Sequence, residues 1–268
     1  MIVGLLSRSR TFVKQLPPVR AWRAHEREYQ FAHGKRRLFR GVYGSFEEAA
    51  SAAPRVIKAD SKAFEVNRIS RIGYRRVTGW DYPVIFWLGR ILTAGSSVLD
   101  FGGSVGISYY SFSKHLSFPT GLTWKVCDTP EVVESGRAIA EEEGAANLTF
   151  TSEFHDGSGS DILIAAGMLH YVDEPLAALV SRLPEKPKHI LVNKTPLQSG
   201  SPFVTLCNYA GHSFIPYHIF NRDAFVESIC RLGYELVDEW ENPGLTCEII
   251  SHPERSLDVY SGLYFRQA

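Results

Sequence analysis

The stretch Ser97-Val98-Leu99-Asp100-Phe101-Gly102-Gly103-Ser104-Val105-Gly106 decides how this chain of 268 residues folds. It is a hydrophobic strand that ends in an acid, followed by a glycine-rich turn and a helix. Glycines let the backbone bend tightly and let a ligand approach the main chain without a Cβ atom in the way. In an open parallel sheet, ligands bind beyond the carboxyl ends of the strands, usually at the first strand-to-helix turn. The stretch therefore predicts a ligand site at a strand end.

Short apolar runs alternate with helical segments from Ser96 onward. The strand candidates are residues 97–101, 123–127, 148–151, 161–165 and 189–193. The helix candidates between them are residues 107–116, 131–143 and 175–183. After Pro196 the order loosens, and then Asn221 caps a helix that ends at Leu232 and is followed by strand candidates at 234–240 and 259–266. Strands separated by helices predict right-handed crossovers, and hence an α/β, doubly wound and mostly parallel sheet.

The first 90 residues show a different pattern. We expect a helix over 18–30, then a turn-rich aromatic stretch over 39–46. A short helix capped by Ser45 should stop before Pro54, because a hydroxyl cap and early acids favour a helix start. Further helices are expected over 56–76 and 82–92. The predicted organisation is a basic N-terminal segment (1–37), a helical extension or lid (38–90) and a ligand-binding domain (91–268).

The composition is that of an ordinary globular protein, with 44% hydrophobic and 22% charged residues. The first apolar run covers only residues 1–6, whereas a signal peptide needs an apolar core of roughly 7 residues and a membrane span about 20. Four scattered cysteines without a CxxC pair indicate reduced thiols. We therefore expect a cytoplasmic protein. A zinc site drawn from Cys207, His212 and His218 is rejected because the usual ligand spacing is missing, so no metal is expected.

The net charge of zero hides an asymmetry between the two ends of the chain. Residues 1–80 hold 17 Lys and Arg against 6 Asp and Glu, whereas residues 81–268 hold 12 against 23. The basic segment is suited to an anionic surface, a phosphorylated substrate or a nucleic acid. Equally, it could pack on the acidic body or be solvated. Peripheral contact of residues 1–40 with an anionic surface is therefore one of several open readings.

The glycine turn indicates which ligand it suits. A nicotinamide or flavin fingerprint needs G-x-G-x-x-G, but the sequence has Gly102, Ser104 and Ile107 at those places, and the G-K-[ST] of a phosphate loop is absent. Asp100 would repel a pyrophosphate, yet its carboxylate can accept hydrogen bonds from a cationic amino-acid ligand. These features favour S-adenosylmethionine, which carries an ammonium and a sulfonium and no phosphate.

The segment 98–106 resembles the first motif of class I S-adenosylmethionine-dependent methyltransferases. Four segments resemble one bacterial family of methyltransferases often associated with surface-polysaccharide gene clusters: F-x-G-V-Y-x-S-F-x-x-A at 39–49, the D-F-G-G-S turn, W-x-V-x-x-x-P-x-V-x-x-G at 124–136 and L-x-Y-x-x-x-P at 169–175. Asn193-Lys194-Thr195-Pro196 stands where that family tends to have Asp-Arg-Thr-Pro. The resemblance covers residues 38–266. It implies a seven-stranded Rossmann-like sheet and methyl transfer to a small-molecule or glycan-linked acceptor.

The cofactor-binding residues are expected at successive strand ends. Asp128 follows the second strand, where a carboxylate can accept from both ribose hydroxyls. Ser152 or Glu153 would lie near the adenine, and small residues around Gly167 and Met168 would leave room for the methionine arm. The glycine turn supplies the remaining members of the predicted site, namely Asp100, Gly102, Gly103, Ser104 and Gly106.

His170 is the predicted general base, because a hydroxyl acceptor must lose a proton and His is the usual base near neutral pH. His212 and His218 compete for that role, and Tyr43 could close the pocket. Two other functions stay open. One is a nucleic-acid methyltransferase that uses the basic segment, although no Asn/Asp-Pro-Pro-aromatic tetrad or RNA-binding module is present and nucleic acid is not the expected partner. The other is a catalytically inactive S-adenosylmethionine-binding regulatory protein.

Overall fold

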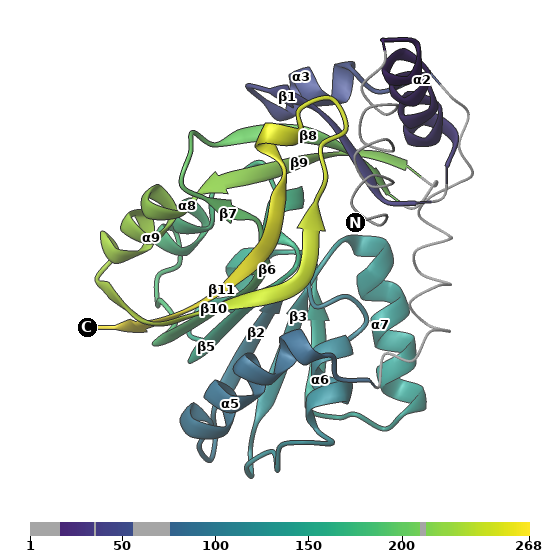
Figure 1. The fold of residues 1–268 in the computed structure, drawn as a ribbon. Helices are drawn as coiled ribbons and strands as arrows, with labels where there is room; N and C mark the ends of the chain where they lie inside the picture. The colour runs from purple at the N-terminus through teal and green to yellow at the C-terminus, as the bar shows by residue number, and fades with distance from the viewer. Residues whose placement is uncertain (1–16, 35, 56–75, 210–212) are drawn as a thin grey trace, which may run out of the picture.

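A seven-stranded sheet forms the centre of the molecule, with the strand order β10-β11-β6-β5-β2-β3-β4 (Figure 1). The computed structural model describes residues 17–34, 36–55, 76–209 and 213–268. The strands are β2 (Ser97–Phe101), β3 (Thr123–Cys127), β4 (Leu148–Thr151), β5 (Ile162–Ala166), β6 (His189–Thr195), β10 (Tyr234–Cys247) and β11 (Leu257–Gln267). Strands β2 to β6 pair in parallel, whereas β11 runs antiparallel to both β6 and β10. The predicted doubly wound, mostly parallel sheet is confirmed.

Helices cover both faces of this sheet. One face packs against α5 (Tyr82–Ile91), α6 (Ile107–Phe112) and α7 (Pro130–Glu142), and the other against α8 (Leu176–Ser181) and α9 (Arg222–Cys230). Alternate residues of β5 supply the two cores: Ile162 and Ile164 face the first layer, and Leu163 faces the second. All three side chains are fully buried. Burying each one stabilises the fold by about 1.5–3 kcal/mol. The two helical layers thus fix the position of β5, and with it the loop that follows the strand.

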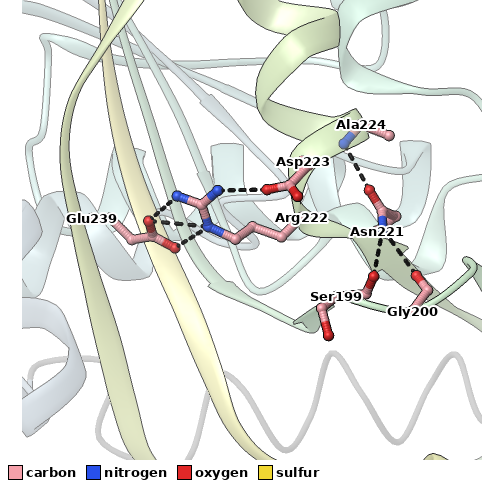
Figure 2. A network of polar contacts seen from close by, with 7 residues as sticks. All are labelled: Ser199, Gly200, Asn221, Arg222, Asp223, Ala224 and Glu239. Carbon is pink, nitrogen blue, oxygen red and sulfur yellow. Dashed lines mark hydrogen bonds and ion pairs between the residues drawn. The ribbon is translucent and has the colours of Figure 1, made fainter.

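The predicted helix start at Asn221 is confirmed. Its side-chain oxygen accepts from the backbone N–H of Ala224 at 2.7 Å, and its amide donates to the carbonyls of Ser199 and Gly200 (Figure 2). The next residue, Arg222, is bound by Glu239 of β10 at 2.5 Å. Cap and ion pair together anchor α9 between the loop before β8 and the C-terminal hairpin.

A second sheet, which the sequence pattern did not predict, lies above the first in the view of Figure 1. Its order is β1-β8-β9-β7, formed by β1 (Leu38–Tyr43), β7 (Leu197–Gln198), β8 (Phe203–Tyr209) and β9 (Ser213–Asn221). The expected turn over 39–46 and the loosened order after Pro196 are therefore wrong. A bulge between Arg40 and Tyr43 takes up Gly41, which has a φ of 79°, so a turn-like sequence still pairs as a strand.

The N-terminal region contains α2 (Pro17–His33), α3 (Phe46–Ser51) and the short 3-10 helix η1 (Gly79–Asp81). Ser45 accepts from the N–H of Glu48 at 3.1 Å, which confirms the predicted cap. The helix expected over 56–76 lies outside the described residues except for Arg76. The extension 38–90 thus begins with a strand, and the boundaries after residues 37 and 90 stay predictions.

Three further 3-10 helices follow strands of the chain: η2 (Phe154–Gly157), η3 (Leu169–Tyr171) and η4 (Pro253–Arg255). Of these, η3 directly follows β5 and so lies at the carboxyl edge of the parallel sheet. Among the described residues, no helix is long and apolar enough to cross a lipid bilayer.

Candidate functional site

The turn after β2 has the backbone conformation that its glycines predict. Gly102, Ser104 and Gly106 have φ values of 72°, 56° and 89°, in the left-handed region that favours glycine. Ser104 therefore replaces a glycine at a position where a side chain is strained. Its backbone N–H donates to Asp128 Oδ2 at 2.9 Å.

Asp100 is the polar centre of the site. It is 1% exposed, and its carboxylate accepts from Trp124 Nε1 at 3.3 Å. A Cβ atom at Gly103 would lie 2.5 Å from Asp100 Cγ, so only glycine leaves room for this carboxylate. Burial raises the pKa of Asp100 to about 7, although hydrogen bonds from Trp124 and Ser108 oppose the shift. A buried acid with this pKa is poised to pair with a cation.

A cavity of about 200 Å³ lies against Asp100. The cavity is lined by Arg76, Thr78, Asp81, Asp100, Gly102, Gly103, Ser104, Ile107, Ser108, Ser111, Phe112, Ala166 and Lys194. Ser104 Oγ is buried without a hydrogen-bond partner within the described part of the chain, which marks a polar position that a ligand can satisfy. A larger and more open hollow of about 460 Å³ lies along α7 and β4, but it contains none of the predicted residues.

Asp128 lies one residue beyond β3 and ties the glycine turn to the neighbouring strand end. Besides Ser104, the N–H of Thr129 donates to its carboxylate, at 2.7 Å. A carboxylate can accept several hydrogen bonds at once, so Asp128 can join the turn and the neighbouring strand end. The structure thus brings Asp128 next to the turn, as the spacing predicts.

Of the remaining predicted cofactor residues, some lie at the strand ends near the glycine turn and others are exposed to solvent. Met168 lies over Gly102, where an added Cβ atom would approach its Cγ to less than a normal contact distance. Gly167 directly follows β5 and has a φ of 76°, and Gly106 caps α6. Ser152 and Glu153 follow β4, are exposed and do not line the cavity; their role near an adenine stays a prediction.

His170 is not brought to the cavity. It is 3% exposed, and its ring packs against those of Tyr217 and Tyr171 at centroid distances of 4.1 and 4.3 Å. Its Nδ1 has no partner among the described residues. Burial, and secondarily Arg37, holds its pKa well below the usual value, so the ring is neutral. The structure therefore places His170 in an aromatic cluster.

The competing residues also lie away from the cavity. His218 of β9 stacks on Phe220 at 4.2 Å, and Tyr43 folds over Gly41 and packs near Phe31 and Leu38. His212 lies outside the described residues. Within the described ranges, no group of three His, Cys, Asp or Glu side chains is arranged to hold a metal ion.

Sequence reasoning missed the charged part of the cavity lining that comes from β6 and from the segment before α5. Asp81 and Lys194 form an ion pair of 2.7 Å there, and Thr78 donates to Asp81 through both its N–H and its hydroxyl. A Thr-x-x-Asp pattern before a helix is a capping-box signal, and Lys194 belongs to the Asn-Lys-Thr-Pro segment noted above. Each signal was visible by itself, but nothing in the sequence indicated that they meet.

Comparison with known proteins shows the fold. No family model matches the chain, and no curated protein matches it. A "putative sarcosine dimethylglycine methyltransferase" from Galdieria sulphuraria superposes with a TM-score of 0.53 at 12% identity, covering 78% of this chain and 99% of that one. A magnesium protoporphyrin IX methyltransferase from Synechocystis PCC 6803, solved with bound S-adenosylhomocysteine, has a TM-score of 0.52 at 16% identity, covering 78% and 96%. The chain has the Rossmann-like methyltransferase fold of these proteins.

Proposed function

We propose that the protein is a class I methyltransferase that uses S-adenosylmethionine. The observation that carries this proposal is the buried Asp100, which lies one residue before the end of β2, precedes the glycine turn and lines the cavity. A carboxylate in this position can accept hydrogen bonds from a ligand ammonium and would repel a pyrophosphate. The methyltransferase fold of the structural neighbours supports the same assignment.

The residues around the cavity fit this cofactor. Asp100 would accept from the ammonium, and the Asp128 carboxylate at the end of the neighbouring strand would accept from the ribose hydroxyls. Gly103 leaves the space that the Asp100 carboxylate needs, and Ser104 Oγ supplies a buried hydroxyl without a partner in the described residues. The donors and acceptors thus match an amino acid joined to a nucleoside.

When bound, S-adenosylmethionine supplies a methyl group already activated on a sulfonium. The contribution of the chain is therefore to bind, align and exclude water, since proximity alone can account for much of the rate of an aligned displacement. Met168 covers Gly102, and η3 follows it at the carboxyl edge of the parallel sheet, where ligands of open parallel sheets bind. His170 stays the predicted base, but its burial among tyrosine rings leaves the proton-accepting group of the acceptor site unassigned.

We further propose a small-molecule acceptor. The names of the two superposed proteins refer to sarcosine, dimethylglycine and a magnesium porphyrin, which are small molecules, and the sequence resemblance points to glycan-linked acceptors. A cytoplasmic location and contact of residues 1–40 with an anionic surface complete the proposal. The excess of basic residues before position 81 supports that contact.

Calorimetric titration with S-adenosylhomocysteine, with NAD as the control ligand, tests the proposal. We expect micromolar binding of S-adenosylhomocysteine and none of NAD. Binding of the former would justify an acceptor screen that begins with nucleotide sugars and glycan extracts. Absence of S-adenosylhomocysteine binding by a folded protein would contradict the proposal, because the glycine turn would then serve packing only.

A further inference from the structure

Lys194 has an unusual backbone at the carboxyl end of β6. Its φ is 53°, and the only other described residue besides glycine with a positive φ is Ser104, which lines the same cavity. A non-glycine residue costs free energy in this conformation, and such strain gathers at ligand-binding positions. The strained backbone sends the Lys194 side chain past Gly167, whose added Cβ atom would lie 3.6 Å from that of Lys194.

The lysine is held in place by the segment before α5. Asp81 is 8% exposed and pairs with Lys194 Nζ at 2.7 Å. The neighbouring Asn193 donates to the carbonyl of Trp80 at 2.8 Å and accepts from Trp240 at 3.0 Å. Two consecutive residues of β6 therefore hold η1 beside the cavity. The ammonium of Lys194 is thus held in a fixed position in the absence of a ligand.

Charges of both signs line the same cavity, and Lys194 is close enough to Asp100 to lower its pKa, against the larger effect of burial. Asp100 comes from the strand before the glycine turn, whereas Lys194 comes from β6, and Arg76 and Asp81 come from the segment before α5. A lysine ammonium has three donors, and Asp81 uses one of them among the described residues. The side chain of Lys194 is 26% exposed, while Arg76 is exposed. Lys194 is thus the better desolvated cation, and a ligand anion gains more from it.

We propose that Lys194 recognises the carboxylate at the amino-acid end of the cofactor and determines the selectivity of the site for a ligand with an intact α-amino acid. This inference rests on the proposed function. The ligand ammonium pairs with Asp100 and the ligand carboxylate with Lys194, so the zwitterion matches the two opposite charges that line the cavity. Asp81 orients the lysine and is a positioning residue.

The test compares two ligands that differ only in this carboxylate: S-adenosylhomocysteine and its decarboxylated form, S-adenosyl-3-thiopropylamine. Calorimetry on the full chain gives the ratio of their dissociation constants. A hydrogen bond to a charged group predicts that the wild type binds the carboxylated ligand roughly 10- to 100-fold more tightly. Lys194→Asn, which tolerates the positive φ, should bring the ratio close to one, and Lys194→Arg should restore most of it.

Two controls separate carboxylate recognition from a merely structural ion pair. Lys188→Asn breaks a matched lysine–aspartate pair, with Asp161 at 2.8 Å, at the opposite end of β6, and should leave both affinities unchanged. Asp81→Asn removes the charge that orients Lys194 but keeps the lysine, so the ratio should fall only in part. Lys194→Asn leaves the buried Asp81 without a counter-charge, and the double variant Lys194→Asn/Asp81→Asn removes that charge as well. Thermal unfolding checks that each variant folds.

Retention of the wild-type ratio in folded Lys194→Asn or in the double variant would overturn the inference, as would an equal loss of the ratio in Asp81→Asn and Lys194→Asn. In either case S-adenosylhomocysteine still binds, and the proposed function survives. If the wild type binds neither ligand, the proposed function itself fails and the inference falls with it.

Discussion

Asp100 and His170 are both buried ionisable residues at the same edge of the parallel sheet, yet their surroundings differ. Asp100 is 1% exposed and faces a cavity that also contains hydroxyls and two cations. His170 is 3% exposed and is packed against tyrosine rings of η3 and β9. Burial raises the pKa of the first and lowers the pKa of the second, so each neutral form is favoured.

The difference shows how to separate a ligand-binding residue from a packing residue. A neutral imidazole among rings needs no counter-charge, whereas a carboxyl group with a pKa near 7 changes its charge when a cation enters the cavity beside it. Perturbed pKa values alone would have marked both residues as functional. The adjoining cavity distinguishes them, and the following variants test that distinction.

Asp100→Asn should have the largest effect on S-adenosylhomocysteine binding. The substitution keeps the shape and an acceptor for Trp124 but removes the charge that pairs with the ligand ammonium. We expect a loss of about 2–3 kcal/mol, or roughly 30- to 150-fold in the dissociation constant, measured by calorimetry. An unchanged affinity in Asp100→Asn would mean that another group binds the ligand ammonium. Asp100 would then be a packing residue, as His170 is.

The affinity of the wild type should also depend on pH. Because Asp100 has a pKa of about 7 in the free protein, it must lose a proton to pair with the ammonium at lower pH. Affinity should therefore be level above pH 7 and fall by about tenfold per unit as the pH decreases below it. Titrations between pH 5.5 and 8 measure this, and Asp100→Asn should flatten the profile. A wild-type profile that is already flat would contradict the role of Asp100.

Gly103→Ala should weaken binding by displacing the same carboxylate. The new methyl group would lie 2.5 Å from Asp100 Cγ, so the side chain must move, and we expect a loss of about 1–2 kcal/mol in binding free energy. Gly79→Ala is the matched control, since an added Cβ atom there meets nothing within 4 Å. Equal affinities of the two variants would mean that the site tolerates a displaced Asp100.

Asp128→Ala should weaken binding at the ribose end of the ligand, on average by less than Asp100→Asn does at the ammonium. It removes acceptors for the ribose hydroxyls and also loosens the glycine turn, because Ser104 donates to this carboxylate. The expected loss is about 1–3 kcal/mol in titrations with S-adenosylhomocysteine. Adenosine-containing ligands without the amino-acid end should lose affinity equally, and a loss confined to the full ligand would remove Asp128 from the ribose site.

His170→Gln should have the smallest effect on binding. The variant should keep its S-adenosylhomocysteine affinity but change the pH dependence of unfolding. Since the pKa of His170 is lowered in the folded state, only the unfolded chain takes up this proton just below pH 6.5, and wild-type stability is lost as the pH falls. Urea unfolding at pH 5 and 8 should show a smaller acid-induced loss in His170→Gln. A weakened affinity would instead bring His170 into the site.

The sequence predicted the central sheet and half of the site because the relevant signals are local. The bounds of β2, β3 and β4 match the expected runs, since apolar strands and a glycine turn are continuous in the chain. The second sheet was missed because β1 pairs with β8, with Phe39 opposite Cys207. A pairing across such a separation leaves no periodicity that a window of neighbouring residues can detect.

The sequence by itself therefore determined the doubly wound sheet, the strained turn from Gly102 to Gly106 and the acid that precedes it. Only the tertiary structure decided what faces that acid. It brought Lys194 and Asp81 together in the lining of the cavity, and it packed His170 against tyrosine rings outside that cavity. The physical reason is that a strand end is specified by residues in sequence, whereas the polarity around it depends on segments that meet only when the chain packs.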